Sequence, residues 1–161
     1  MMFTGNSYAT GREFGGDGKP IDREAMSWDI SILKFSSTYE AVTEIPDDEV
    51  PASLGARESI HAAVSKIFAH TDWSDPYWGV LDASFGSIEF NLGRDNPVGS
   101  LMLHVHAGVE VVPMIVQLCG ANGWQAIDCS TCDFIEKSVE PEKGLGIWTA
   151  YTNQVIGNDG A

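Results

Sequence analysis

Residues 87–106 read SIEFNLGRDNPVGSLMLHVH. Hydrophobic and polar side chains alternate in residues 87–92 and again in residues 100–106, which is the two-residue period of a strand with one buried face. The segment between them, residues 93–99, contains glycine, asparagine, aspartate and proline, which favour turns. The sequence therefore predicts a β-hairpin with an apolar face and a polar face.

Other segments on either side of this hairpin carry the pattern of a strand or a helix. The spacing of Ile60, Val64, Ile67 and Phe68 places them on one face of a helix. Asn122 and Gly123 are typical of a helix end. Strands are predicted over residues 27–35, 77–82 and 124–128, and helices over residues 55–70, 110–121 and 146–156.

The order strand, helix, strand, strand, strand, helix, strand predicts an α+β fold, specifically a two-layer sandwich. We expect a mixed or mostly antiparallel sheet of about five strands, with two main helices on one face and a C-terminal helix. The turn residues of 71–76 predict a connector, and the two prolines of residues 44–51 predict a loop.

The chain divides into two parts of different composition. Residues 1–25 are rich in glycine and lack hydrophobic periodicity, so we interpret them as a flexible arm before one globular domain, residues 26–161. The arm holds four acidic and three basic residues, so almost all of the formal net charge of −14 belongs to the domain.

That charge limits the partners of the protein. A strongly negative surface repels phosphate backbones and anionic lipids, so we expect neither nucleic acid nor a membrane as a direct partner. The chain opens with no secretory signal pattern and has three cysteines, an odd number, so we expect a reducing, cytoplasmic location.

Four residues suggest a metal site. His104 and His106 point to the same side of one strand, and Cys129 and Cys132 have the spacing of a zinc knuckle or a redox motif. Together they would make a Cys₂His₂ set if their strands were neighbours. The alternative is that the histidines face solvent and the cysteines occupy a turn.

No pattern of a nucleophile elbow, a dinucleotide-binding loop or a phosphate-binding loop is present in the sequence. We therefore expect a protein that is not an enzyme and needs no cofactor. Two acidic segments suggest binding instead, because aromatic anchors ringed by charge are typical of protein interfaces. The predicted contact residues are Asp47, Asp48, Glu49, Asp72, Trp73, Asp75, Tyr77 and Trp78. The alternative is that Trp73 and Trp78 cover the edge of the core.

Several short motifs together resemble a known group of proteins. They are residues 26–30 (MSWDI), 72–76 (DWSDP), 88–93 (IEFNLG), 103–106 (LHVH) and 123–128 (GWQAID). The chain resembles small bacterial single-domain proteins without an assigned function, often encoded near polymorphic toxin and immunity genes. That group has glycine where this chain has Cys132, which weakens a function for the cysteine pair.

The resemblance and the charge lead to one main hypothesis. We expect an immunity-type inhibitor that covers the active site of a basic toxin domain, for example a nuclease. The alternatives are a metal-binding protein or metal-dependent enzyme using His104, His106, Cys129 and Cys132, and a structural homodimer subunit.

Overall fold

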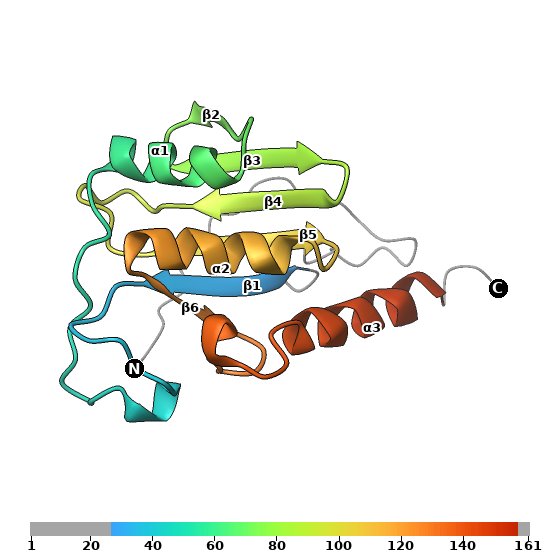
Figure 1. Cartoon of the computed structure of the whole chain (residues 1–161). Coiled ribbons are helices and arrows are strands. Elements are labelled where there is room, and N and C mark those ends of the chain that lie inside the picture. Colours follow the sequence, from blue (N-terminus) through green and yellow to red (C-terminus); the bar gives the residue numbers. More distant parts are fainter. Residues whose placement is uncertain (1–26, 158–161) are drawn as a thin grey trace.

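The computed structural model describes residues 27–157, so the predicted arm of residues 1–25 lies outside the described residues. One antiparallel sheet forms the centre of the structure (Figure 1). Its six strands lie side by side in the order β2-β3-β4-β5-β1-β6. Their bounds are β1 Trp28–Leu33, β2 Asp72–Asp75, β3 Trp78–Ala83, β4 Gly86–Asn91, β5 Leu101–Ala107 and β6 Gln125–Asp128.

Helices α1 (Arg57–Ile67) and α2 (Val111–Asn122) cover one face of this sheet, whereas α3 (Lys143–Gly157) lies near the end of the sheet where β1 begins (Figure 1). Two short 3₁₀ helices, η2 (Val42–Glu44) and η3 (Ile135–Lys137), complete the described elements. The α+β fold predicted from the sequence is confirmed. Within residues 27–157, no helix is both long and apolar enough to cross a bilayer.

The hydrophobic core lies between the sheet and helices α1 and α2. Alternation along β4 and β5 directs their apolar side chains to this side, where Ile88, Phe90 and Leu103 are fully buried. They belong to one cluster with Val64 of α1 and Ile115 of α2. Burying an apolar side chain of this size contributes about 1.5–3 kcal/mol, so this layer is what stabilises the fold.

Helix α2 ends where the sequence predicts. Gly123 has the left-handed conformation, with φ +68°, and its backbone N–H donates to the carbonyl of Cys119. Glycine adopts this conformation without the steric cost that a side chain would add. In contrast, α3 begins at Lys143, three residues before the predicted start at Gly146.

Residues 72–75 correct the sequence prediction, because the expected connector is the edge strand β2. Its residues, Asp-Trp-Ser-Asp, are ones that favour turns, which hid the strand. Two side chains of this strand also accept hydrogen bonds from backbone N–H groups nearby in the chain. Asp72 accepts a hydrogen bond from the Ser74 N–H at 2.8 Å, and Asp75 accepts one from the Tyr77 N–H at 2.9 Å. The sheet therefore has six strands instead of five.

Candidate functional site

The side of the sheet that faces away from α1 and α2 is polar, and we call it the outer face. Cross-strand partners place their side chains on the same side of an antiparallel sheet. Glu89 pairs with both Val80 and His104, and His104 pairs in turn with Asp29. The outer face consists of Asp29, Ser31, Asp72, Asp75, Trp78, Val80, Asp82, Ser87, Glu89, Asn91, Met102, His104 and His106.

The described strands of this face carry acidic side chains and no basic ones. The six described strands contain six Asp or Glu residues and no Lys or Arg. One of the six, Asp128, pairs with Ile30, which belongs to the core side, and is buried. The other five, Asp29, Asp72, Asp75, Asp82 and Glu89, lie on the outer face.

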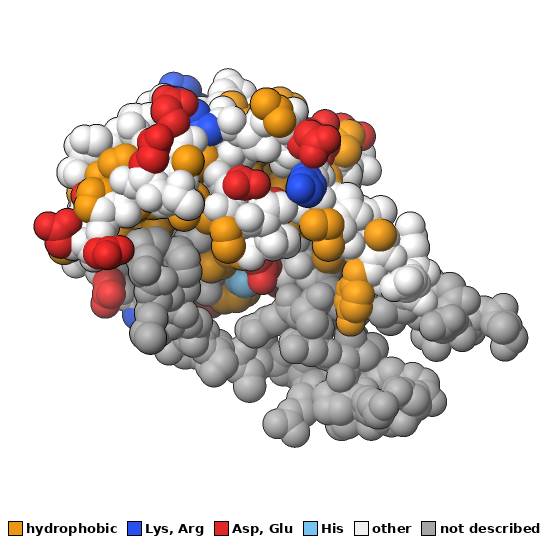
Figure 2. Space-filling model, turned by 90° about the horizontal axis from the view of Figure 1, so that it is seen from below, with side chains coloured by type: hydrophobic (Ala, Val, Ile, Leu, Met, Phe, Trp, Pro, Cys, Tyr) orange, Lys and Arg blue, Asp and Glu red, His pale blue; other side chains and the backbone are white. Residues whose placement is uncertain are grey.

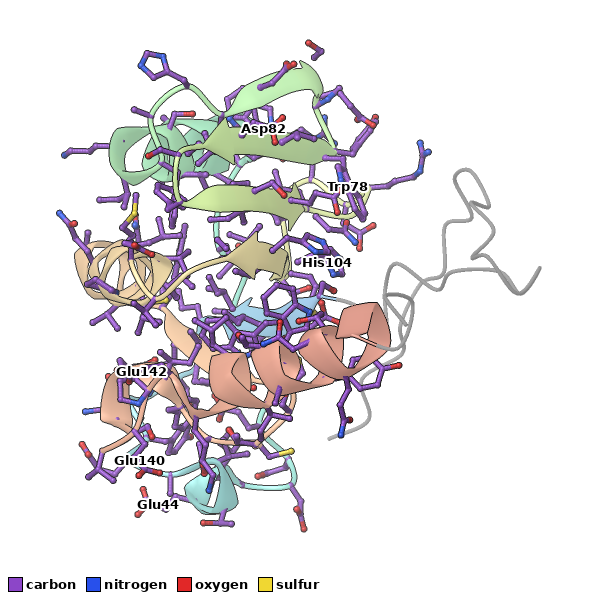
Figure 3. All side chains as sticks on the ribbon, turned by 90° about the vertical axis from the view of Figure 1, so that its right-hand side faces the viewer. Glu44, Trp78, Asp82, His104, Glu140 and Glu142 are labelled. Carbon is purple, nitrogen blue, oxygen red and sulfur yellow. The ribbon has the colours of Figure 1, made fainter. Side chains whose placement is uncertain are left out.

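Trp78 and His104 form the centre of the outer face. Their rings are stacked, with centroids 5.4 Å apart and planes 15° apart. Figure 3 shows the two side chains on the side of the sheet opposite α1 and α2. Behind the pair, the Nδ1 atom of His104 lies 2.8 Å from the Oδ1 atom of Asp29. An ionised carboxylate only accepts hydrogen bonds, so Nδ1 carries the proton and the imidazole is held in one orientation.

Ser27 completes this polar cluster but does not make it a catalytic triad. The Ser27 hydroxyl donates to the same Oδ1 atom of Asp29 that His104 contacts. In a triad the imidazole must lie between the nucleophile and the carboxylate to take the proton of the nucleophile. Here the carboxylate lies between the serine and the imidazole, so Asp29 orients both groups. The cluster is suited to positioning rather than to nucleophilic attack.

The chain matches no protein-family model, no curated protein and no solved structure. The role of the outer face therefore follows from its own geometry. An aromatic ring among carboxylates favours the binding of a cationic group.

The predicted contact residues between Asp72 and Trp78 do not form one patch. Trp73 points to the helix side, where its indole N–H donates to the Ser65 hydroxyl at 3.0 Å and its ring stacks on His61. Trp78 lies on the outer face instead. Trp73 thus covers the core, in line with the alternative reading, whereas Trp78 is part of the polar face.

Tyr77 and the neighbouring acids have local roles as well. The guanidinium groups of Arg57 and Arg94 lie over the Tyr77 ring, 4.4 Å and 5.0 Å from its centroid. Hydrogen bonds from the side chain and backbone of Ser74 lower the pKa of Asp72. The carboxylates of Asp72 and Asp75 are exposed on the outer side of β2.

The second predicted acidic group, Asp47 to Glu49, lies at the other end of the sheet. β2 is one edge strand, whereas the segment that carries these acids packs along β6, the opposite edge. Asp47 and Asp48 are exposed. Hydrogen bonds from the backbone and side chain of Ser36 hold Glu49 and lower its pKa. The two predicted acidic groups therefore do not make one surface.

Acidic side chains are dispersed on the side of the molecule that is seen from below. Figure 2 shows, on the side seen from below, several separate acidic side chains with hydrophobic ones between them and few basic ones. Carboxylates spread in this way repel each other less than clustered ones, and they keep the surface charged. The outer face is thus distinguished by having carboxylates from five positions of one sheet.

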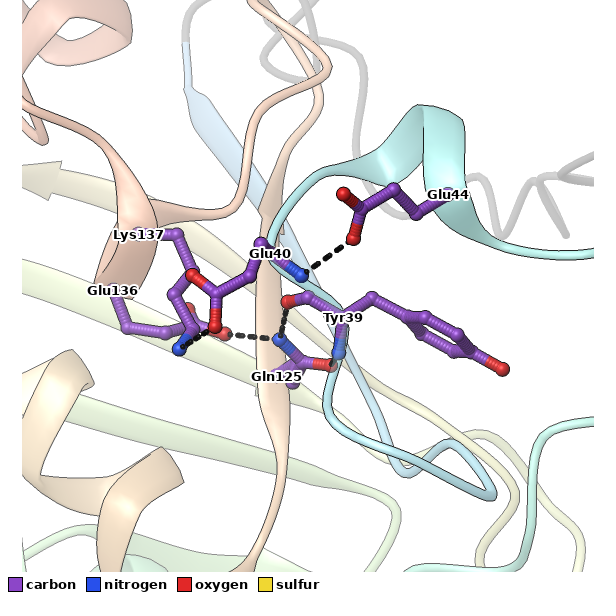
Figure 4. Close-up of polar contacts among 6 residues, drawn as sticks. All are labelled: Tyr39, Glu40, Glu44, Gln125, Glu136 and Lys137. Atoms are coloured by element: carbon purple, nitrogen blue, oxygen red, sulfur yellow. Dashed lines mark hydrogen bonds and ion pairs between the residues drawn. The ribbon is translucent and has the colours of Figure 1, made fainter.

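A polar cluster fastens the segment before Asp47 to β6 (Figure 4). The buried amide of Gln125 accepts from the Tyr39 N–H and donates to the Tyr39 carbonyl, both at 2.9 Å. Glu136 accepts from the Gln125 amide and from the Ala126 N–H, both at 3.2 Å. At its border, Lys137 and Glu40 form an ion pair at 2.9 Å. Burial raises the pKa of Glu136.

Replacing Glu136 with Gln is expected to remove a loss of stability that the wild type undergoes as the pH rises. The folded carboxyl has a pKa above its ordinary value of 4.5, so the folded state holds a proton that the unfolded state releases. Its contribution to stability is complete below pH 4.5 and is lost as the pH rises through the folded pKa. When urea unfolding is measured at pH values rising from about 4 to about 7, the free energy of unfolding of the wild type should fall relative to that of Glu136→Gln.

The exposed Glu140 provides the control for this measurement, because Glu140→Gln removes the same charge outside the polar cluster. Its stability should keep the pH profile of the wild type. Parallel profiles for the wild type and Glu136→Gln would contradict the assignment.

The four residues of the metal hypothesis are not assembled. Among residues 27–157, no three or more His, Cys, Asp or Glu side chains are placed to hold one metal ion. Strand β1 separates His104 on β5 from Cys129, which follows β6. Desolvation, and then the charges of Asp29 and Asp128, raise the pKa of Cys129 to about 11. A thiol with that pKa stays protonated at neutral pH, so it is a poor nucleophile.

Sequence reasoning did not place Asp29, Asp82 and Glu89 on one face with Trp78 and His104. The signal for each was present, because each occupies a polar position in an alternating strand. What the sequence lacked was the strand order. Only the order β2-β3-β4-β5-β1 brings these three acids together with Trp78 and His104.

Proposed function

We propose that this protein is a non-enzymatic, acidic binding protein whose outer face docks a basic protein partner. The observation that carries the proposal is the charge of the outer face, which holds five of the six carboxylates of the described strands, while those strands contain no Lys or Arg. Such a face attracts a positive surface and repels negative ones.

The class of partner follows from the same charge. Nucleases hold phosphate groups with basic surfaces, so a face of carboxylates is a physical competitor for their substrates. With the resemblance to proteins encoded near toxin and immunity genes, this supports an immunity-type inhibitor that covers the active site of a basic toxin domain. The acids also raise the rate of encounter with such a domain at low ionic strength.

A second copy of the chain fits the outer face less well. Two outer faces in contact would bring Asp75, Asp82 and Glu89 against the same carboxylates of the partner copy. Like charges facing each other across an interface cost several kcal/mol. The homodimer hypothesis therefore gains no support from this face.

Replacing both Asp75 and Asp82 with Asn is expected to weaken binding to the product of the neighbouring gene. At low ionic strength the affinity should fall about fivefold to tenfold, because each exposed charge pair contributes about 0.2–1 kcal/mol. Asn keeps the oxygen that accepts from the Tyr77 N–H, so the turn after Asp75 should be retained. Isothermal titration at about 0.05 M and about 0.5 M salt measures both affinity and its salt dependence.

The matched control is Asp47→Asn with Asp48→Asn, which removes the same charge at the opposite edge of the sheet. Its affinity should stay close to that of the wild type. If both double variants weakened binding equally, net charge alone would matter and the docking face would be wrong. Failure of the neighbouring gene product to bind at either salt concentration would exclude it as the partner and count against the immunity function.

A further inference from the structure

The Trp78–His104 pair is built before any partner arrives. Trp78 on β3 reaches across β4 to His104 on β5, and the rings stack at 5.4 Å. Asp29 holds His104 from the far side at 2.8 Å. A surface with fixed rings binds without the cost of ordering its side chains.

Carboxylates lie next to both rings of the pair. Asp75 is the cross-strand partner of Trp78, and Glu89 is the cross-strand partner of His104. Facing side chains on an antiparallel pair have Cβ atoms about 4.5–5.5 Å apart, so these carboxylates border the aromatic surface. The centre of the outer face thus presents Trp78, stacked on His104, with carboxylates on the neighbouring strands.

Arginine matches this arrangement better than lysine does. A guanidinium group is planar, stacks on aromatic faces, and directs its N–H donors outward in its own plane toward carboxylates. An ammonium group is a compact, strongly hydrated charge that gains less from a flat surface. The same chain already packs guanidinium groups on an aromatic ring beside this site, since Arg57 and Arg94 lie over Tyr77.

We infer that the outer face binds an arginine side chain of its protein partner at Trp78, with Asp75 and Glu89 receiving the N–H groups of the guanidinium. The inference rests on the proposed function and adds the identity of the central contact. In this arrangement Trp78 is the anchor of the interface, and Asp29 acts through His104 as a positioning residue.

The test uses the full chain and two blocked peptides of equal length and charge, tri-arginine and tri-lysine, titrated at low ionic strength. The wild type should bind tri-arginine about fivefold more tightly than tri-lysine, because a cation–π contact at an exposed site contributes about 1 kcal/mol. Trp78→Leu, which keeps an apolar side chain without a π face, should abolish the preference. Glu89→Gln provides a second variant and should reduce the preference while retaining the rings.

Asp47→Asn with Asp48→Asn should leave the preference intact. Equal affinity of the wild type for both peptides, with weaker binding by Asp75→Asn plus Asp82→Asn, would overturn the arginine inference and leave the acidic docking face standing. A preference for arginine that persists in Trp78→Leu would also overturn it. If Asp75→Asn plus Asp82→Asn bound both peptides as well as the wild type does, the docking face of the proposed function would itself be wrong.

Discussion

Gly86→Ala is expected to lower the free energy of unfolding by about 3–5 kcal/mol, because it combines backbone strain with a collision. Gly86 has φ +126°, a conformation that side chains rarely adopt. A Cβ atom there would lie 2.4 Å from the carbonyl oxygen of His106 and 2.6 Å from the Cα atom of Ala107. Both atoms belong to the backbone of β5, so no side chain can move aside to make room.

The predicted loss is a large part of the stability of a domain of this size, which is typically about 5–15 kcal/mol. Gly86 opens β4 and pairs with Ala107, so the collision lies at the end of the central β4–β5 ladder. Opening this ladder would disturb the register of His104 and Glu89 on the outer face. Urea unfolding followed by circular dichroism measures the effect.

Two other glycines separate the causes of that loss. Gly93 has φ +66° and open space around it, so Gly93→Ala should cost only the backbone strain, about 1–2 kcal/mol. Gly99 has neither a positive φ nor a neighbour within 4 Å, so Gly99→Ala should change stability by less than about 0.5 kcal/mol. If Gly86→Ala lowered the free energy of unfolding no more than Gly93→Ala does, the predicted collision with β5 would be wrong.

Much of the fold was predictable because the hydrophobic pattern acts locally. Strict alternation in β4 and β5 fixes which side chains are buried, and the helical spacing of Ile60 and Val64 fixes the face of α1. Gly123 ends α2 because its own backbone adopts the left-handed conformation. Each of these features depends on residues close together in the sequence.

The edge strand β2 was not predictable in the same way. Its residues favour turns, and its strand conformation depends on pairing with β3 and on the packing of Trp73 beside Gly79. A Cβ atom on Gly79 would lie 2.7 Å from the Trp73 ring, so this pair of residues is matched in size. Tertiary contacts, rather than local preference, determine β-structure at such an edge.

The candidate site required the strand order. Trp73 and Trp78 are close in the sequence, yet the β2–β3 hairpin sends them to opposite faces of the sheet. Asp29 is far from His104 in the sequence, yet their side chains meet at 2.8 Å. Grouping residues by sequence distance therefore located some of the acids and missed the face that they share.

Gly144→Ala is expected to destabilise the protein by about 1–3 kcal/mol, because a Cβ atom at this position overpacks a closed contact. That atom would lie 2.0 Å from the Oδ2 atom of Asp128 and 2.6 Å from its Cγ atom. Asp128 is only 3% exposed, and its other oxygen accepts from the Ser130 N–H at 2.8 Å. The carboxylate thus has little room to move away from the first turn of α3.

The position of Asp128 explains why the first turn of α3 approaches so closely. A carboxylate at a helix N-terminus interacts favourably with the helix dipole, typically by about 0.3–1 kcal/mol. Leu145, the next residue of the helix, is almost fully buried in the main core. Displacing this turn would therefore remove both the electrostatic contact and the burial of Leu145, and would shift Trp148, whose ring meets His106 at 6.1 Å.

Gly146 is the matched control on the same helix, because nothing lies within 4 Å of its Cβ position. Gly146→Ala should stabilise the protein by about 0.5–1 kcal/mol, since alanine favours a helix more than glycine does. The two glycine substitutions, two residues apart, should therefore change the urea midpoint in opposite directions. A Gly144→Ala variant as stable as Gly146→Ala would contradict the contact with Asp128.

A double-mutant cycle isolates that contact from every other effect of the substitution. In an Asp128→Ala background the carboxylate is gone, so Gly144→Ala meets no collision and should become neutral or stabilising through helix propensity. The coupling energy between the two positions should then be about 1–3 kcal/mol. Additive effects would mean that Gly144→Ala acts through the helix alone, and that α3 is not held against the sheet by its approach to Asp128.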